Sequence, residues 1–371
     1  MPAAELINIQ PKRILVITLR FLGDTLLTTP LISSLKQAYP NADVDVLLPA
    51  ANSAMLEGNP DITQLLTLPK NISALDFAKL LFKLYRRYDL AISTQAGDRP
   101  TLCAIMAGKI SLGFIPDDPG KAWWKKKLLH HWLVFNRDYD HAVLENLRFC
   151  KVLGIAPCYR LTPPHTDQVT YPLPKPPYAV LHIMPQWRYK QWHKAGWLEL
   201  ISFLSHHGLG IVLTGSGEAN ELHYLQQLQQ QLPAKTTNLA GKLSLAELTD
   251  LIGNADLFVG PDTGITHLAA ATGTTTCAIF GPTDPKKWAP WPVDYARDKS
   301  PFAPKGTQHV GNVYLIQGRT EQACMPCQLE GCERHRSSHS VCLDQLTADE
   351  VIDIISNLPL MAGNRGNNAI L

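Results

Sequence analysis

Residues 258–285 read FVGPDTGITHLAAATGTTTCAIFGPTDP, and this stretch decides the fold class. Its apolar start predicts the end of a strand, the small residues 260–264 predict a turn, and residues 265–272 predict a helix. A second strand is expected at 275–280, followed by another turn of small residues at 281–285. Strands that alternate with helices in this way are typical of a parallel sheet with crossover helices.

The same alternation extends through both halves of the chain. The uniformly apolar run ILVIT, residues 14–18, indicates a strand buried on both faces. In the N-terminal half we predict helices at 25–38 and 74–87 and strands at 13–18, 43–48, 64–68, 89–93 and 110–114. In the C-terminal half we predict further strands at 179–183, 210–214 and 256–259 and further helices at 195–207, 220–231 and 245–252. The pattern therefore predicts an α/β fold with two doubly wound parallel sheets.

A proline-rich segment separates the two halves. Seven prolines fall within residues 157–177, a density that is incompatible with a helix or a central strand and typical of a stiff linker. We predict a Rossmann-like domain over residues 1–165, a linker over 166–177, a second Rossmann-like domain over 178–350, and a C-terminal helix and tail over 351–371. Two such domains would face each other across an interdomain cleft, and ligands of doubly wound sheets bind at the carboxyl ends of the strands.

The composition is that of a globular protein. Hydrophobic residues make up 45% of the chain and the formal net charge is +2, which by itself identifies no class of partner. Residues 1–12 lack the apolar core of a signal peptide, and no run approaches the roughly 18 apolar residues of a spanning helix. We therefore expect a cytoplasmic protein whose association with a membrane, if any, is peripheral.

The turn at residues 260–264 and the helix after it form a candidate anion-binding site. A helix N-terminus offers free backbone N–H groups and the positive end of the helix dipole, which suit a phosphate. His267 lies three residues into this helix, where its side chain can point back at a bound anion. The alternative is an ordinary strand-to-helix turn with His267 as a satisfied helix residue.

Two other loops are expected at the same edge of the second sheet. Lys190 follows the strand at 179–183 and could balance the negative charge on a diphosphate leaving group. Glu218 follows the strand at 210–214 and could accept hydrogen bonds from ribose hydroxyls. The alternatives are a solvated loop lysine and an acid that is favourable in the first turn of a helix.

The loop after the first strand carries a candidate general base. In LRFLGDTLLTTP, residues 19–30, Gly23 permits a tight turn and Asp24 follows it at the start of a helix. Asp24 is either the N-cap of that helix or a carboxylate that accepts the proton of an attacking sugar hydroxyl. The loop has no GxGxxG pattern, so the dinucleotide-binding fingerprint is absent.

Residues 121–132, KAWWKKKLLHHW, combine basic and aromatic side chains without an acid. Lys125, Lys126 and Lys127 beside tryptophans suit an anionic membrane surface or a phosphorylated glycolipid acceptor. The alternative is a solvated basic face with its tryptophans in the core.

Four cysteines cluster late in the chain, with two histidines between the last pair, at Cys324, Cys327, Cys332, His335, His339 and Cys342. Such clustering in a cytosolic protein favours a metal over a disulfide. A structural zinc ion, free thiols and a disulfide formed on purification are the three interpretations. No catalytic metal is expected.

Three stretches carry a resemblance to a known family. They are RILVITLRFLGDTLLTTPLISSLKQAYPNADVDVLLP at 13–49, Lys190-Gln191-Trp192, and DTGITHLAAATGTTTCAIFGPTDPKKWAPW at 262–291. Together they resemble glycosyltransferase family 9, the ADP-heptose-dependent heptosyltransferases of the lipopolysaccharide core. The resemblance implies a GT-B fold and an inverting, metal-independent transfer of heptose from ADP-heptose to a lipopolysaccharide core acceptor, without a cofactor. The N-terminal stretch most resembles the enzymes that add the third, branching heptose.

Matching the family motifs by position implies a role for individual residues. The residues that would contact the donor are Lys190, Glu218, Asp262, Thr263, Gly264 and His267. Thr263 and Gly264 would donate backbone N–H groups to the diphosphate, with Asp262 nearby on the sugar or phosphate. Asp24 would be the general base in the acceptor-binding domain.

The match is less close at two places in the second domain. Glu221 could be aligned in place of Glu218. Met184 and Pro185 stand where the family usually has small hydroxylated residues, so part of the phosphate contact differs there.

Two other functions on the same fold are kept as alternatives. A nucleotide-sugar epimerase would act without an acceptor and would need no membrane-docking surface. A non-catalytic nucleotide- or glycolipid-binding protein would have no use for a base, so Asp24 favours the enzyme over this alternative.

Overall fold

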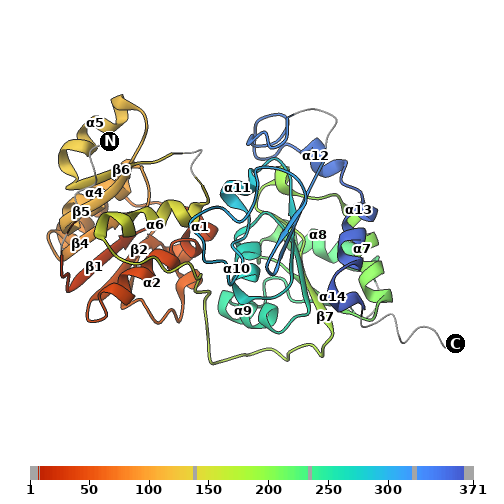
Figure 1. Ribbon diagram of the computed structural model, residues 1–371. Helices are drawn as coiled ribbons and strands as arrows, with labels where there is room; N and C mark the ends of the chain where they lie inside the picture. The colour runs from red at the N-terminus through yellow and green to blue at the C-terminus, as the bar shows by residue number, and fades with distance from the viewer. Residues whose placement is uncertain (1–6, 8, 137–139, 233–235, 320–323, 363–371) are drawn as a thin grey trace. The chain divides into compact units, whose positions relative to one another are not determined.

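The computed structural model describes residues 7, 9–136, 140–232, 236–319 and 324–362, which belong to two compact α/β units (Figure 1). The first unit runs to Pro164 and also takes in Ala296–Ser300, while the second comprises His165–Tyr295 and the chain from Pro301 onward. An ion pair between Lys151 Nζ and Asp298 Oδ2, 2.8 Å apart, joins the returning segment to the first unit. The sequence places a single break near residue 165 and does not foresee this return.

The first unit is built on a six-stranded sheet in the order β3-β2-β1-β4-β5-β6, in which neighbouring strands are parallel. The strands are β1 (Arg13–Ile17), β2 (Asp43–Pro49), β3 (Gln64–Leu68), β4 (Tyr88–Ser93), β5 (Gly108–Ile115) and β6 (His131–Val134). The first five match predicted strands, and β6 was not predicted. Ile14 in β1 pairs with Val44 on one side and Leu90 on the other and is fully buried, as the apolar run ILVIT predicts.

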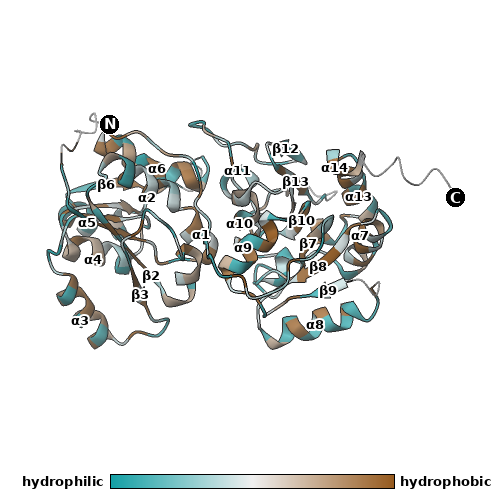
Figure 2. Cartoon of the chain, turned by 90° about the horizontal axis from the view of Figure 1, so that it is seen from below, coloured by the Kyte–Doolittle hydropathy of each residue, from teal (hydrophilic) through white to brown (hydrophobic). Residues whose placement is uncertain are grey.

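Helices connect these strands. They are α1 (Leu22–Leu26), α2 (Thr29–Ala38), the 3-10 helix η1 (Ala50–Leu56), α3 (Ala74–Leu84), α4 (Asp98–Ala107), α5 (Pro119–Leu128) and α6 (Ala142–Leu153). Helix α2 packs on α6, and α3 packs on α4. Outer helices such as α3 and α8 carry both hydrophilic and hydrophobic residues along their length (Figure 2), which is the pattern of helices with one face on a core.

The single helix predicted over residues 25–38 is wrong, because the chain forms two helices there. Pro30 has no N–H to donate to the carbonyl of Leu26, so one continuous helix would leave that carbonyl without its partner. Thr29 Oγ1 donates to the Leu26 carbonyl instead, at 2.8 Å. The break leaves α1 as a short helix that carries Asp24.

The second unit is built on a seven-stranded sheet in the order β12-β13-β11-β10-β7-β8-β9, in which only the β12–β13 pair is antiparallel among the described strands. The strands are β7 (Tyr178–His182), β8 (Gly210–Thr214), β9 (Thr236–Asn238), β10 (Leu257–Pro261), β11 (Thr276–Phe280), β12 (Gln308–Val310) and β13 (Val313–Gln317). Trp192 and Trp197 are fully buried in the core beside β7 and β8. The predicted doubly wound α/β architecture is therefore confirmed in both units.

The helical segments of the second unit are η2 (Arg188–Lys190), α7 (Lys194–His206), α8 (Ala219–Gln229), α9 (Leu245–Gly253), α10 (Gly264–Thr272), α11 (Pro285–Trp288), α12 (Val341–Asp344), α13 (Ala348–Ser356) and α14 (Pro359–Ala362). Ser244 and Glu247 form the capping box that their spacing predicts at the start of α9. Helix α13 packs on α7 (Figure 1), so the C-terminal helix is part of this unit. Every described helix is too short or too polar to traverse a lipid bilayer.

The end of the proline-rich segment is anchored on α9. Thr170 donates both its backbone N–H and its hydroxyl to Glu247 Oε1, with the backbone contact at 3.0 Å. Tyr171 Oη donates to the Glu247 carbonyl at 3.1 Å. These contacts hold part of the predicted linker against the second unit.

Candidate functional site

The candidate site of the second unit lies at the carboxyl edge of its sheet. Strands β11, β10, β7 and β8 are consecutive neighbours in that sheet and run parallel. The loops that leave their carboxyl ends are therefore side by side, which is where doubly wound sheets bind ligands. These loops carry the predicted donor-site residues Lys190, Glu218, Asp262, Thr263 and Gly264.

Lys190 and Asp262 form an ion pair at this edge. The distance from Lys190 Nζ to Asp262 Oδ2 is 2.6 Å, and the side chains are only 16% and 6% exposed. Asp262 is held in place because its backbone N–H donates to the Ile279 carbonyl at 3.1 Å. Two residues that are far apart in the sequence are thus brought together because β7 and β10 are neighbours. A bound anion would compete with Asp262 for the same ammonium group.

The N-terminus of α10 lies beside this ion pair. Thr263 is the N-cap residue and Gly264 begins the helix, but the Thr263 side chain caps no backbone N–H. The first N–H groups of a helix have no acceptor within the helix, and together they form the positive end of its dipole. The structure therefore presents backbone donors at the position predicted for a diphosphate.

His267 is buried in the first turn-and-a-half of α10. The pKa of His267 is lowered to about 4, chiefly by burial; Asp262 opposes this shift and Lys190 adds to it. The imidazole is therefore neutral at pH 7. Within the described part of the chain its Nδ1 atom has no hydrogen-bond partner. A buried ring nitrogen in this state is suited to one hydrogen bond with a bound group.

The two candidate carboxylates of the β8 loop differ in where they point. Glu218 is the exposed N-cap residue of α8 and its side chain makes no capping hydrogen bond. Glu221 is buried, its Oε2 accepts from the Ser216 N–H at 2.8 Å and from the Ser216 hydroxyl, and burial raises its pKa. Its Oε1 has no partner among the described residues. Glu221, the alternative that the sequence offers, is therefore the inward-facing carboxylate, and Glu218 is the exposed one.

Two aromatic residues next to Lys190, Trp187 and Tyr189, belong to this edge without being predicted from the sequence. The Trp187 and Tyr189 rings are stacked with centroids 5.9 Å apart, and Lys190 Nζ lies 5.3 Å from the Trp187 centroid. Arg336 packs its guanidinium over the same Trp187 ring at 4.8 Å. The only sequence signal for this group is the run of aromatic and basic residues at 187–194.

Asp24 lies at the carboxyl edge of the first sheet, in the first turn of α1. The N-cap of this helix is Phe21, so the expectation that Asp24 caps the helix is wrong. The preceding loop is tied to neighbouring strand ends, since Leu19 N–H donates to Gln95 Oε1 at 3.0 Å and Asn52 Nδ2 donates to the Arg20 carbonyl at 2.8 Å. An acid in this position interacts favourably with the helix dipole, and its carboxylate is also placed where this class of sheet binds ligands.

The three lysines predicted for docking do not form one surface. Lys125 is only 2% exposed, because its Nζ donates to the Ala96 carbonyl and pairs with Asp98 Oδ1 at 2.8 Å. Lys125 is therefore a structural residue, and its predicted contact with a membrane or acceptor is wrong. Lys126 and Lys127 are exposed, with their ammonium groups 5.0 and 5.5 Å from the ring centroids of Trp132 and Trp123.

Two Rossmann-like units, the second with a lysine and a helix N-terminus at its carboxyl edge, are typical of the GT-B fold. Two solved structures share this fold. An E. coli ADP-heptose lipopolysaccharide heptosyltransferase II is 20% identical, with a TM-score of 0.71 over 95% of this chain and 99% of its own. A glycosyltransferase family 9 protein from Veillonella parvula is 17% identical, with a TM-score of 0.71 over 92% of this chain and 95% of its own.

Sequence comparison identifies the family. A lipopolysaccharide heptosyltransferase 3 from Escherichia coli is 31% identical over an alignment of 292 positions that covers 74% of this chain and 84% of that protein. Its counterpart from strain K12 is 30% identical over 293 residues, covering 74% and 83%. Residues 154–305 match glycosyltransferase family 9 (heptosyltransferase). The chain therefore belongs to glycosyltransferase family 9, the heptosyltransferases, as its motifs predict.

Proposed function

We propose that this protein transfers a heptose from ADP-heptose to the inner core of lipopolysaccharide, with inversion at the anomeric carbon. The observation that carries the proposal is the Lys190–Asp262 pair beside the N-terminus of α10, where the Thr263 side chain caps no N–H group; such an arrangement suits a diphosphate. The likeness to two heptosyltransferase 3 proteins supports heptose as the sugar and the third heptose as the addition.

In the proposed reaction, Asp24 accepts the proton of the acceptor hydroxyl while that oxygen attacks the anomeric carbon of the donor. The new C–O bond forms on the face opposite the diphosphate, the bond to ADP breaks, and ADP leaves with the electron pair. A single displacement of this kind inverts the configuration of the anomeric carbon. The base and the groups that stabilise the leaving ADP are supplied by different units of the chain.

The charge that develops on the leaving ADP needs compensation. Lys190 and the backbone N–H groups of Thr263 and Gly264 would supply it, so the proposal includes no metal ion. Neutral His267 would hydrogen-bond a phosphate or sugar oxygen without adding charge. Glu221 would accept hydrogen bonds from the ribose hydroxyls through its unpaired Oε1.

The test is an incubation of the purified chain with ADP-heptose and a heptose-deficient lipopolysaccharide core, followed by measurement of ADP release and acceptor mass. We expect the acceptor to gain one heptose and ADP to be released only when the acceptor is present. Conversion of the donor sugar without an acceptor would point to an epimerase. Tight ADP binding without any turnover would point to a non-catalytic binding protein, and either result would overturn the proposal.

We also propose that the exposed face of α5 and β6, formed by Trp123, Lys126, Lys127 and Trp132, rests on the anionic cytoplasmic surface of the inner membrane. Trp123 is 58% exposed, and aromatic rings beside lysines are suited to the headgroup region. Such contact would keep the enzyme peripheral and close to a membrane-anchored acceptor.

Reversing both Lys126 and Lys127 to glutamate is expected to weaken binding to anionic vesicles by at least about tenfold, since each surface lysine contributes about 1 kcal/mol. The measurement is co-sedimentation with vesicles that contain phosphatidylglycerol. The matched control reverses two exposed lysines elsewhere, Lys299 and Lys305, and should bind as the parent does. Equal binding by both double variants would rule out this face as the docking surface.

A further inference from the structure

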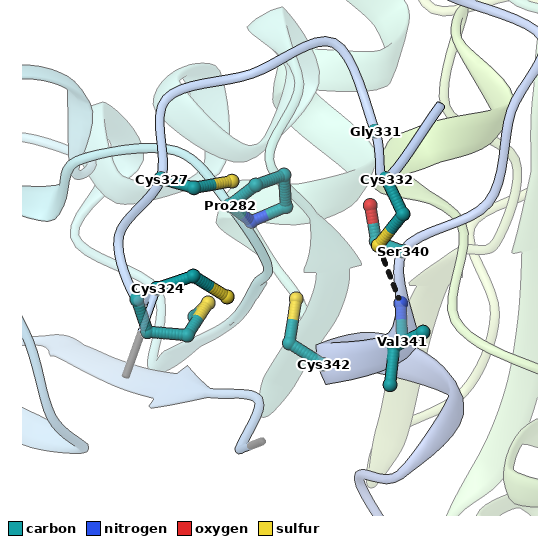
Figure 3. Close-up of a pocket in the computed structure, with 9 residues that line it drawn as sticks. Pro282, Cys324, Cys327, Gly331, Cys332, Ser340, Val341 and Cys342 are labelled. Atoms are coloured by element: carbon teal, nitrogen blue, oxygen red, sulfur yellow. Dashed lines mark hydrogen bonds between the residues drawn. The ribbon is translucent and has the colours of Figure 1, made fainter. Parts of the chain in front are cut away.

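Four cysteines that lie close together in the sequence, between residues 324 and 342, surround a single pocket. Cys324, Cys327 and Cys332 come from the loop before α12, and Cys342 comes from α12 itself. We call them the cysteine cluster. Figure 3 shows their side chains around one hollow, with the sulfur of Cys342 rising into it from the helix. The remaining described cysteines lie outside this pocket, so the gathering is specific to these four.

The contacts around the pocket favour sulfur as its chemistry. The sulfur of Cys332 accepts a hydrogen bond from the Val341 N–H at 3.4 Å, a contact that stabilises a thiolate. Cys342 is buried and lines the same pocket.

The two histidines of the segment point elsewhere. His335 Nε2 lies 2.9 Å from Glu333 Oε2, and His339 Nδ1 lies 3.9 Å from Asp344 Oδ2. Both histidines are exposed. A mixed set of sulfur and nitrogen ligands is therefore not what the fold presents, and the pocket offers four sulfurs.

We propose that the cysteine cluster binds one divalent metal ion, zinc or iron, through four thiolates. Four sulfurs in a tetrahedral set select these metals over magnesium or calcium, which prefer oxygen. Within the described residues, no three potential ligands are gathered closely enough to hold a metal in this structure, so binding draws the loop toward α12. Each thiol releases its proton to solvent as it becomes a ligand, and the affinity therefore falls as the pH is lowered.

The metal would act by fixing the turn that carries Lys190, a role that rests on the proposed function. The Ser340 hydroxyl donates to the Tyr189 carbonyl at 2.6 Å, next to Lys190. Gln328 N–H donates to the Pro282 carbonyl at 2.8 Å, in the turn after β11. The segment with the cysteine cluster thus holds two of the loops at the carboxyl edge, and the metal stabilises that segment without contacting the donor.

The experiment measures metal content by elemental analysis of the full chain purified under reducing, anaerobic conditions. We expect about one zinc or iron ion per chain, and the metal found identifies which of the two is bound. Cys324→Ser and Cys342→Ser should each lower the metal content per chain by at least about tenfold. Circular dichroism checks that both variants remain folded. Cys158→Ser and Cys277→Ser are matched controls for a partly exposed and a buried thiol, and should retain the metal. Cobalt added to the metal-free chain should give a thiolate-to-cobalt charge-transfer band.

Several results would overturn the proposal, and none depends on transfer activity. One is a fully reduced chain that takes up neither zinc, iron nor cobalt. Another is a metal that is retained when Cys324 and Cys342 are both replaced. The positioning role is tested by calorimetry, where removal of the metal should weaken ADP binding several-fold. Unchanged ADP affinity after loss of the metal would limit the metal to a local structural role and overturn this part.

Discussion

Replacing Asp24 by asparagine is expected to reduce the rate of heptose transfer by about 10²–10⁴-fold, the usual contribution of a positioned general base. Asparagine has nearly the same shape as aspartate but cannot accept the proton of the acceptor hydroxyl. Because Asp24 belongs to the first unit and the diphosphate site to the second, the Kd for ADP should stay nearly unchanged. Steady-state kinetics with ADP-heptose and calorimetry with ADP measure the two quantities separately.

The competing explanation for Asp24 is a stabilising interaction with the dipole of α1, and the chain offers a matched control for it. Asp76 occupies the same third position of α3, after the N-cap Ser73, and is exposed. Asp76 also contacts the Ser73 hydroxyl and Lys79 at the surface, so Asp76→Asn should lower the free energy of unfolding only slightly and leave transfer intact. If Asp24→Asn shows this same small loss of stability with full activity, Asp24 is a first-turn acid and not the base. Loss of ADP affinity in a folded Asp24→Asn chain would also contradict the assignment.

The parts of the fold that could be predicted are those that local sequence determines. Apolar runs such as residues 14–18 become strands because they are buried on both faces, and the capping box of α9 depends on two residues three positions apart. The break between α1 and α2 was missed, although Pro30 carries the signal, because the apolar pattern continues across it. The apolar pattern favours one continuous helix, whereas Pro30 favours a new helix that begins just before it. A proline is tolerated in the first turn of a helix, so the sequence alone does not decide between the two.

The parts of the site that could not be predicted depend on contacts between distant segments. Lys125 looks like one of three equivalent basic residues, and only the approach of Asp98 on α4 distinguishes it as buried. Glu218 is the N-cap residue of α8 and Glu221 lies in the first turn of the same helix, and the orientation of α8 against β8 decides which of them faces inward. Sequence spacing contains neither kind of information.

Lys190→Met is expected to lower kcat by about 10²–10³-fold, because this change removes a charge that stabilises the leaving diphosphate as its negative charge grows. The Kd for ADP should rise as well, since ADP carries the same diphosphate. Methionine keeps most of the apolar length of the side chain beside Trp187 and Tyr189, so the packing of the two rings is largely preserved. Single-turnover kinetics with ADP-heptose measure the first effect, and calorimetry measures the second.

The same substitution has a structural cost that must be separated from its effect on catalysis. Asp262 is left buried without its cation, and removal of one partner of a buried ion pair costs about 3–5 kcal/mol of folding free energy. Lys190→Met combined with Asp262→Asn removes the unpaired charge and should regain most of that stability while the rate remains low. Lys125→Met provides the control, because it removes another buried lysine from an ion pair and should lower stability without changing the Kd for ADP. A double variant that regains both stability and rate would show that Lys190 serves the fold and not the leaving group.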